Sequence, residues 1–254
     1  MDSIRPPFKT FETGPKLGHA HTHTLIFLHG RGDNTYAFWN GLEKWRDSQN
    51  RTLRDAFPTF RFVLPEAPWR PLARDRSVVW RQWYDLWNTK DFAEREELQA
   101  IGLKEVVPGL RKLVAKEAKL LDGHSDRIVL AGMSMGGATA SHLLFNLDVP
   151  LAAFMGFACR CPFVGRTLPQ MRQVLGLEGV PADNEVLRRT PVLLEHCVDD
   201  PVVLVQNGRS LRDTLISFGC QVEWIEYPNG GHWFNAPRGM DDAVQFLQNV
   251  LSKA

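Results

Sequence analysis

Short apolar runs alternate with longer stretches of helical periodicity along most of the chain. Each run is bounded mainly by glycine, proline or polar residues, as buried parallel strands are. The runs are residues 25–28, 60–64, 128–131, 152–158, 192–194 and 222–225. The helix-like stretches are 94–121, 137–147, 202–218 and 240–251, and Pro108 is expected to start a new helix inside the first. This alternation predicts an α/β fold, a doubly wound and mostly parallel sheet with helices on both faces.

Residues 66–93 differ in composition and periodicity from the rest of the chain. They are rich in tryptophan, proline and arginine and show no clear period, which is typical of a long functional loop or a cap. No other break in composition divides the 254 residues. We therefore expect a single domain over 1–254, with a loop or cap at about 66–93.

Charge and cysteine usage exclude several classes of partner and location. The net charge of +1 provides no basic field for nucleic acid. No apolar run approaches the length of a membrane span, and the N-terminal residues 1–7 contain no apolar core of a secretory signal. The four cysteines are interpreted as reduced thiols, which favours a cytoplasmic protein. The sequence leaves the oligomeric state open.

The strongest chemical signal is the motif Gly132-Met133-Ser134-Met135-Gly136, followed by Gly137. It lies between a predicted strand and a predicted helix, which is the context of the nucleophile turn of α/β-hydrolases. Glycine is needed two residues to either side because a side chain there would collide with the neighbouring backbone. Ser134 is therefore predicted to be a nucleophile held in a strained turn, and the fold to be that of an α/β-hydrolase.

A serine nucleophile needs a base, and in this fold the base follows the serine and the acid in the chain. Three histidines follow Ser134. His142 falls inside the predicted helix and is interpreted as a helix-surface residue, and His196 closes a strand and is expected to be buried. His232 lies in a glycine-rich loop beyond the last strand, so it is the predicted base.

The acid is expected after the preceding strand, where Asp199 and Asp200 are adjacent. Asp200 precedes Pro201, so it also fits a helix N-cap. Spacing alone does not separate the two aspartates.

The loop after the first long strand, Gly30-Arg31-Gly32, is expected to complete the site. In this fold the oxyanion is held by a backbone N–H from this loop and by the N–H that follows the nucleophile. These donors are predicted to be the backbone N–H groups of Arg31 and Met135.

Together these pieces resemble the carboxylesterase/acyl-protein thioesterase family, also called the phospholipase/carboxylesterase group. The matching segments occur in the family's order; they are FLHGRGD (27–33), PEAPWRP (65–71), WYDL (83–86), GMSMGG (132–137), HCVDDPVV (196–203) and GH (231–232). The resemblance selects Asp200 as the acid, because the family pattern ends on the valine at 203. It also implies hydrolysis of a small-molecule ester or an acylated substrate without cofactor or metal.

Two departures from the family pattern are expected to reshape the pocket without touching the triad. Cys197 replaces a glycine after the strand histidine, and Cys159-Arg160-Cys161-Pro162 replaces a Ser-Gly before Leu-Pro. Candidate substrate-binding residues are Trp69, Trp83 and Trp233. The aromatic residues of 66–93 are expected to shorten an acyl channel, which favours esters of short or medium acyl groups over acyl-protein thioesters or lysophospholipids.

Two hypotheses of other classes compete. His19, His21 and His23 alternate as metal ligands on a strand do, but they precede the apolar run, whereas such ligands lie at the carboxyl end of a strand. A non-catalytic α/β-hydrolase acting as a small-molecule receptor is the second alternative. Such receptors usually lack a member of the triad, and Ser134, Asp200 and His232 are all present here.

Overall fold

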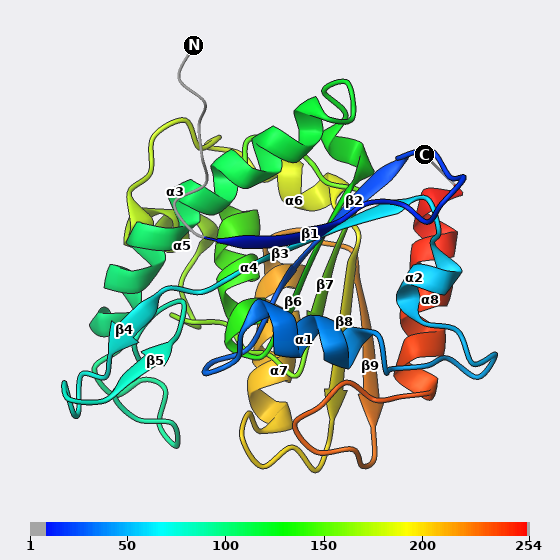
Figure 1. Ribbon diagram of the computed structural model, residues 1–254. Helices are drawn as coiled ribbons and strands as arrows, with labels where there is room; N and C mark the ends of the chain where they lie inside the picture. The colour runs from blue at the N-terminus through cyan, green and yellow to red at the C-terminus, as the bar shows by residue number, and fades with distance from the viewer. Residues whose placement is uncertain (1–8, 253–254) are drawn as a thin grey trace.

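The computed structural model describes residues 9–252 and contains a central seven-stranded sheet in the order β1-β3-β2-β6-β7-β8-β9. Strand β1 pairs antiparallel with β3, and the other neighbouring pairs are parallel. The strands are β1 (Thr10–Thr13), β2 (His23–Leu28), β3 (Phe60–Pro65), β6 (Ile128–Met133), β7 (Ala153–Phe157), β8 (Val192–Cys197) and β9 (Val222–Tyr227). A separate antiparallel hairpin, β4 (Trp69–Pro71) with β5 (Val79–Arg81), lies off this sheet (Figure 1).

Helices cover both faces of the sheet, as Figure 1 shows. One face packs against α3 (Glu97–Lys119), α4 (Met135–Phe145), α5 (Leu168–Leu175), α6 (Glu185–Arg189) and α7 (Val205–Ser217). The other packs against α1 (Thr35–Leu42), α2 (Leu53–Ala56) and α8 (Arg238–Leu251). A short 3-10 turn, η1 (Ser125–Arg127), leads into β6. These layers confirm the predicted doubly wound α/β fold.

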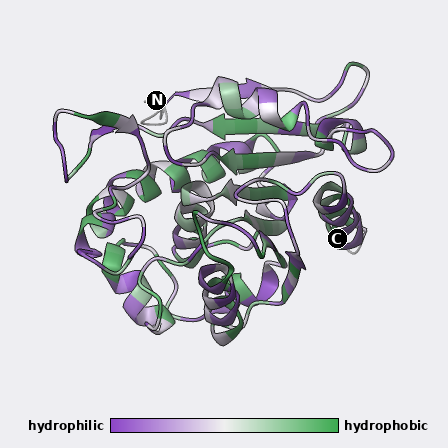
Figure 2. Ribbon diagram, turned by 90° about the horizontal axis from the view of Figure 1, so that it is seen from below, coloured by the Kyte–Doolittle hydropathy of each residue, from purple (hydrophilic) through white to green (hydrophobic). Residues whose placement is uncertain are grey.

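The side chains of the central strands alternate between the two faces, as the two-residue period of a strand requires. Along β2, Leu25 and Phe27 join the core on one face, whereas Ile26 and Leu28 join the core on the other. Both sets are apolar because both faces are covered, and Figure 2 shows largely hydrophobic strands inside the layers.

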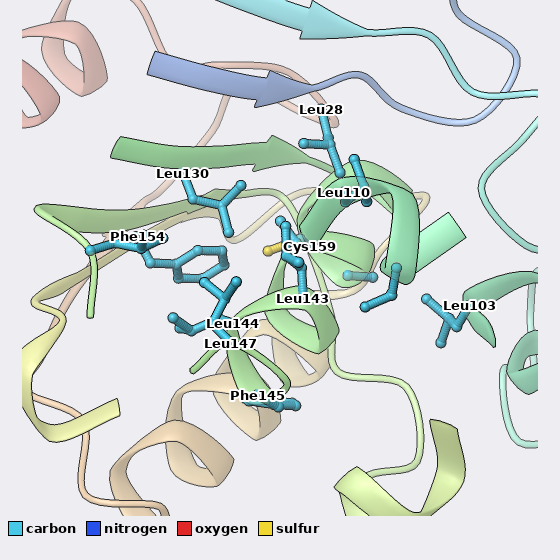
Figure 3. Close-up of a cluster of buried hydrophobic side chains, with 14 of the residues drawn as sticks. Leu28, Leu103, Leu110, Leu130, Leu143, Leu144, Phe145, Leu147, Phe154 and Cys159 are labelled. Atoms are coloured by element: carbon cyan, nitrogen blue, oxygen red, sulfur yellow. The ribbon is translucent and has the colours of Figure 1, made fainter. Parts of the chain in front are cut away.

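Helix α4, which begins next to Ser134, is enclosed on all sides. Every residue from Met135 to Phe145 is buried, because α4 lies between the sheet and helices α3 and α5. Figure 3 shows this core; its labelled side chains come from β2, α3, β6, α4, the segment after α4, β7 and the loop after β7. The start of α4 is therefore held rigidly.

The structure corrects the expected helix boundary at Pro108. Helix α3 runs unbroken from Glu97 to Lys119 with Pro108 inside it. Proline removes one hydrogen bond of the helix, but the buried stripe that includes Val107, Leu110 and Val114 continues across it and keeps both halves against the core.

Two expectations concern the ends of the chain and membranes. Residues 1–7, for which the sequence predicts no secretory signal, lie outside the described residues. Within 9–252, no helix combines the length and the apolar character that a membrane crossing requires.

Candidate active site

Ser134 lies at the sharp turn between β6 and α4. Its backbone has φ 54° and ψ −122°, a conformation that L-residues rarely adopt. The chain turns so tightly that a Cβ on Gly132 would lie 2.5 Å from the carbonyl carbon of Gly136. A Cβ on Gly136 would overlap the backbone oxygens of Leu28 and His29. The two glycines thus allow the strained turn that exposes the Ser134 hydroxyl.

Three side chains from separate loops form one continuous chain of hydrogen bonds. His232 Nε2 lies 2.9 Å from Ser134 Oγ, and His232 Nδ1 lies 2.7 Å from Asp200 Oδ2. The Asp200 side chain is fully buried, whereas 19% of the His232 side chain is exposed. The sequence left Asp199 and Asp200 unresolved on spacing; the structure brings Asp200 to the imidazole.

Asp200 is held by several donors besides His232. Its Oδ1 accepts the backbone N–H groups of Val202 and Val203, and His196 Nε2 lies 3.3 Å from Oδ2. Burial raises the pKa of the Asp200 carboxyl, but the hydrogen bonds from His196, His232 and Val203 outweigh it and hold this pKa well below its usual range. The ionised carboxylate makes Nδ1 of His232 the donor, which leaves Nε2 to accept a hydrogen bond from the Ser134 hydroxyl.

Asp199 also contributes, by organising the loop that carries His232. Its carboxylate accepts the backbone N–H groups of Gly230 at 3.3 Å and Gly231 at 2.8 Å. Helix α7 begins only at Val205, so neither aspartate is its N-cap. Asp199 therefore orders the loop, while Asp200 contacts the imidazole.

The loop after β2 lies directly beside Ser134. A Cβ on Gly30 would be 3.5 Å from the Ser134 Cβ. Within residues 9–252, the backbone N–H groups of Arg31 and Met135 have no hydrogen-bond acceptor, and both residues line the cavity that contains Ser134. Unpaired N–H groups beside a nucleophile can bind a developing oxyanion.

His29 holds the loop after β2 in place through its hydrogen bonds. Its Nε2 accepts the backbone N–H of Ala67 at 3.0 Å, so Nδ1 carries the hydrogen and donates to Gly30 O at 2.8 Å. Burial lowers the pKa of His29, which keeps the ring neutral. Trp83 Nε1 donates to His29 O at 2.9 Å, and Gly32 N donates to Arg81 O at 2.7 Å.

Ser134 and His232 open into a cavity of about 550 Å³. Much of its wall comes from the segment that the sequence singled out, 66–93; these residues are Trp80, Tyr84, Leu86 and Thr89, with Phe92. Trp233, 66% exposed, lies at the cavity as well.

The other two candidate substrate-binding residues lie elsewhere. Trp83 is fully buried in the core and bonded to the loop after β2, because its indole fills space under that loop. Trp69 is 61% exposed on β4, its ring lies under the Arg81 guanidinium, and it is absent from the cavity wall. In our proposal Trp80 and Tyr84 replace them.

The other histidines hold structural positions. His142 is fully buried, which corrects the surface position expected for it: α4 is covered by neighbouring helices, and its Nε2 lies 3.2 Å from Pro162 O. Burial lowers the pKa of His142 to about 4. His196 is buried as predicted and contacts Val203 O. The alternating histidines suggested a metal site. His23 begins β2, so it lies at the end of the strand opposite the Ser134 turn. In the described chain no three His, Cys, Asp or Glu residues are arranged to hold a metal.

The two departures from the family pattern lie around the site. The Cys159 side chain packs against Gly137 at the start of α4, and Cys197 lies beneath Gly230 in the His232 loop. Arg160 lines the cavity. Sequence reasoning marked the Cys159-Arg160-Cys161 departure but assigned Arg160 no role, and it missed the role of Asp199 in the loop.

Comparisons with known proteins identify the family of the chain. Residues 16–251 match the family model described as Phospholipase/Carboxylesterase. Acyl-protein thioesterase 1 of Neurospora crassa is 30% identical over 219 residues, covering 84% of this chain and 80% of the relative. Its counterpart in Mycosarcoma maydis is 29% identical over 254 residues, covering 96% and 97%.

Solved structures with low sequence identity support the fold. The crystal structure of Zea mays acyl-protein thioesterase 2 matches with a TM-score of 0.71 and 22% identity, covering 96% of this chain and 99% of that one. The Bacillus cereus carboxylesterase matches with a TM-score of 0.63 and 16% identity, covering 96% and 95%. On the family model and these relatives, the chain belongs to the phospholipase/carboxylesterase family of α/β-hydrolases.

Proposed function

We propose that this protein is a serine hydrolase that cleaves carboxylic esters of short or medium acyl groups through an acyl-enzyme on Ser134. The observation that carries the proposal is the chain Ser134 Oγ–His232 Nε2–His232 Nδ1–Asp200 Oδ2, with distances of 2.9 and 2.7 Å, at the wall of a cavity. The hydrolase family of the chain supports it.

In the proposed reaction, His232 removes the proton of Ser134 as its oxygen attacks the ester carbonyl. The N–H groups of Arg31 and Met135 bind the oxyanion, and Asp200 stabilises the imidazolium. His232 then protonates the departing alcohol, which leaves the acyl-enzyme. Water, deprotonated by His232, attacks the acyl-enzyme, releases the carboxylic acid and regenerates Ser134. These steps involve no cofactor or metal.

The acyl preference is proposed from the cavity wall, where Trp80, Tyr84 and Phe92 occupy space that a long alkyl chain needs. The main alternative is hydrolysis of acyl-protein thioesters, which is favoured by the names of the relatives in Neurospora crassa and Mycosarcoma maydis. Lysophospholipid hydrolysis is a further alternative, and a non-catalytic receptor is the alternative of another class. The four cysteines are free thiols, which supports the proposed cytoplasmic location.

The test is labelling and turnover in wild type and two serine variants. A fluorophosphonate probe should label wild type on the peptide that contains Ser134, and nitrophenyl butyrate should be hydrolysed. Ser134→Ala should lose labelling and about a thousandfold or more of turnover. Ser217→Ala, an exposed serine on α7 away from the cavity, should match wild type. A folded wild-type protein that neither labels nor turns over ester would support the receptor alternative.

A further inference from the structure

Arg160 is a buried cation in the wall of the Ser134 cavity. It follows β7, in the loop where the chain departs from the family pattern, and is only 5% exposed. Within residues 9–252, no carboxylate oxygen lies within ion-pair distance, 4.0 Å, of its guanidinium. A buried charge without a counter-ion is costly, and such charges in proteins are usually paired.

The groups that contact Arg160 are all neutral. Its Nη2 donates to Gln99 Oε1 at 2.5 Å and lies 3.4 Å from the Tyr84 hydroxyl oxygen. The guanidinium carbon lies 4.1 Å from the centre of the Phe92 ring. These contacts orient the guanidinium and solvate it in part, but they do not neutralise it.

Two of the three guanidinium nitrogens keep free donors. Both hydrogen bonds of Arg160 leave from Nη2, and in the described chain Nε and Nη1 have no protein acceptor. Neither nitrogen is among the fully enclosed polar atoms that lack a partner, so both retain some accessible surface. These N–H groups are free to bind a ligand atom.

The charges near Arg160 leave the cavity with an excess of arginine. The Ser134 cavity is lined by Arg31, Arg160 and one carboxylate, Asp33. Arg31 also lacks an ion pair among the described residues; its Nε donates to Gln82. Glu96 shares the adjoining cavity with Arg160, but its carboxylate accepts the Phe163 N–H at 2.6 Å and forms no ion pair with the arginine.

We propose that Arg160 binds a carboxylate on the substrate, so that this protein prefers esters bearing a free carboxylate remote from the scissile bond. An arginine N–H without a protein acceptor can make a charge-assisted hydrogen bond to a carboxylate oxygen, and the unpaired positive charge of Arg160 attracts the anion. The proposal rests on the proposed ester hydrolysis at Ser134. The carboxylate belongs either to the acyl group or to the alcohol, and the two arms of the experiment distinguish these sources.

The kinetic experiment compares charged and neutral partners in each arm. The acyl arm uses the mono-nitrophenyl ester of suberic acid against the same ester with the distal carboxylate replaced by an N-methylamide. The alcohol arm uses the acetate of para-hydroxyphenylacetic acid against its N-methylamide. Wild type should favour the carboxylate substrate in one arm by about tenfold or more in kcat/KM, mainly through KM, because charge-assisted hydrogen bonds are strong.

Variants assign this preference to Arg160. Arg160→Met should reduce the charged-to-neutral ratio to about one, and Arg160→Lys should retain part of it because the charge remains while the donor nitrogen is displaced. Arg166→Met removes an exposed arginine from the same loop, outside the Ser134 cavity, and should keep the wild-type ratio. The ratio is measured within each variant, so partial loss of folded protein cancels. A ratio near one in both arms of wild type, or a ratio that survives Arg160→Met, overturns the proposal.

A binding measurement separates this proposal from the proposed function. Calorimetric titration of Ser134→Ala with the monomethylamide and the bis-methylamide of suberic acid, and with para-hydroxyphenylacetate and its N-methylamide, requires no turnover. Tighter binding of one carboxylate, lost in Ser134→Ala/Arg160→Met, supports the anion site even if the protein hydrolyses no ester. Ser134-dependent hydrolysis of the neutral esters without any preference for carboxylate supports the proposed function and overturns the role of Arg160.

Discussion

Two adjacent aspartates make different contacts around His232. The Asp200 carboxylate is buried and bonds directly to the imidazole, whereas Asp199 is exposed and bonds only to backbone N–H groups of the His232 loop. An acceptor of a backbone N–H can be a neutral amide oxygen. In the proposed reaction the His232 imidazole becomes cationic, and an ionised carboxylate is the better acceptor for its N–H. Negative charge is therefore expected to matter far more at Asp200 than at Asp199.

Asp200→Asn should therefore reduce kcat on nitrophenyl butyrate by orders of magnitude, because an amide favours the wrong tautomer of His232. Asp199→Asn retains a side-chain oxygen for Gly231 N and should remain within about tenfold of wild type. Steady-state kinetics on both variants, with melting temperatures as the folding check, measures this difference. A larger loss in Asp199→Asn than in Asp200→Asn would reassign the acid.

Functional residues that lie in a local sequence motif could be predicted from the sequence. Residues whose position depends on contacts with distant parts of the chain could not. Ser134 stands in a motif that a strand and a helix frame, and His232 follows two glycines, so both were accessible to sequence reasoning. Asp200 could not be separated from Asp199 by spacing, because the carboxylate that reaches the imidazole depends on the turn. No sequence motif marks Arg160. Its place in the cavity wall depends on contacts with Gln99, Tyr84 and Phe92, which are distant in sequence.

The segment 66–93 both supports the site and forms its wall. Trp83 and Arg81 bond to the loop after β2, in which Gly30 lies beside Ser134. Trp80 of the same hairpin faces the cavity, and the Arg31 guanidinium lies 4.7 Å from the centre of its ring. One segment thus fixes the loop beside Ser134 and limits the cavity.

Trp80→Ala should extend the acyl preference toward longer chains, because it removes an indole from the cavity wall. The measurement is kcat/KM on acetyl, butyryl, octanoyl and palmitoyl nitrophenyl esters. Each additional buried methylene is worth about 0.8 kcal/mol, so a gain should increase with chain length. Trp69→Ala, in the same hairpin but outside the cavity, should leave the profile unchanged.

An acyl profile that already rises to palmitoyl in wild type would contradict the proposed short or medium preference. The acyl-protein thioesterase alternative would then become the better hypothesis. A palmitoylated peptide, assayed alongside the nitrophenyl esters, tests it directly.

The elements predicted from the sequence were those with a clear apolar pattern. Short apolar runs predicted the six parallel strands, and helical periodicity predicted the stretches that form α3, α4, α7 and α8. Strand β1 and the hairpin β4–β5 were missed because they are short and half-exposed, and their pairing partners define them. At Pro108 the local rule failed because the packing of α3 against the core outweighed one missing hydrogen bond.

Across the molecule, the parallel strands carry the site at their carboxyl ends, where ligands bind in open α/β sheets. Ser134 follows β6, Asp200 follows β8 and His232 follows β9. One buried carboxyl in this region belongs to none of the proposed steps. Glu195 on β8 is 4% exposed and packs against Gly239 at the start of α8. It lies beside the Tyr227 hydroxyl, which donates to Asp242 at 2.8 Å.

Glu195 should make the protein less stable as the pH rises. Burial raises the pKa of Glu195 well above its usual range, and the nearby Asp242 carboxylate adds to this effect. The pKa of such a carboxyl is higher in the folded than in the unfolded state. Its contribution to the free energy of unfolding is greatest below the unfolded-state pKa, and it decreases as the pH rises above that value. Asp200 has the opposite shift, so its contribution is lost only at more acidic pH. The two groups therefore act in different pH windows.

Glu195→Gln removes the titrating group and should flatten the fall in melting temperature between about pH 5 and about pH 8. Glu178→Gln is the control, because it removes an exposed carboxylate that is not among the charges acting on Glu195, and it should preserve the wild-type slope. The comparison uses the slope rather than a single melting temperature, since an amide in the same space changes stability at every pH. If the slope of Glu195→Gln equalled that of wild type, the carboxyl would have to be ionised in the folded protein. The Tyr227 hydroxyl, which lies beside both Glu195 and Asp242, would then be the donor that stabilises the buried anion.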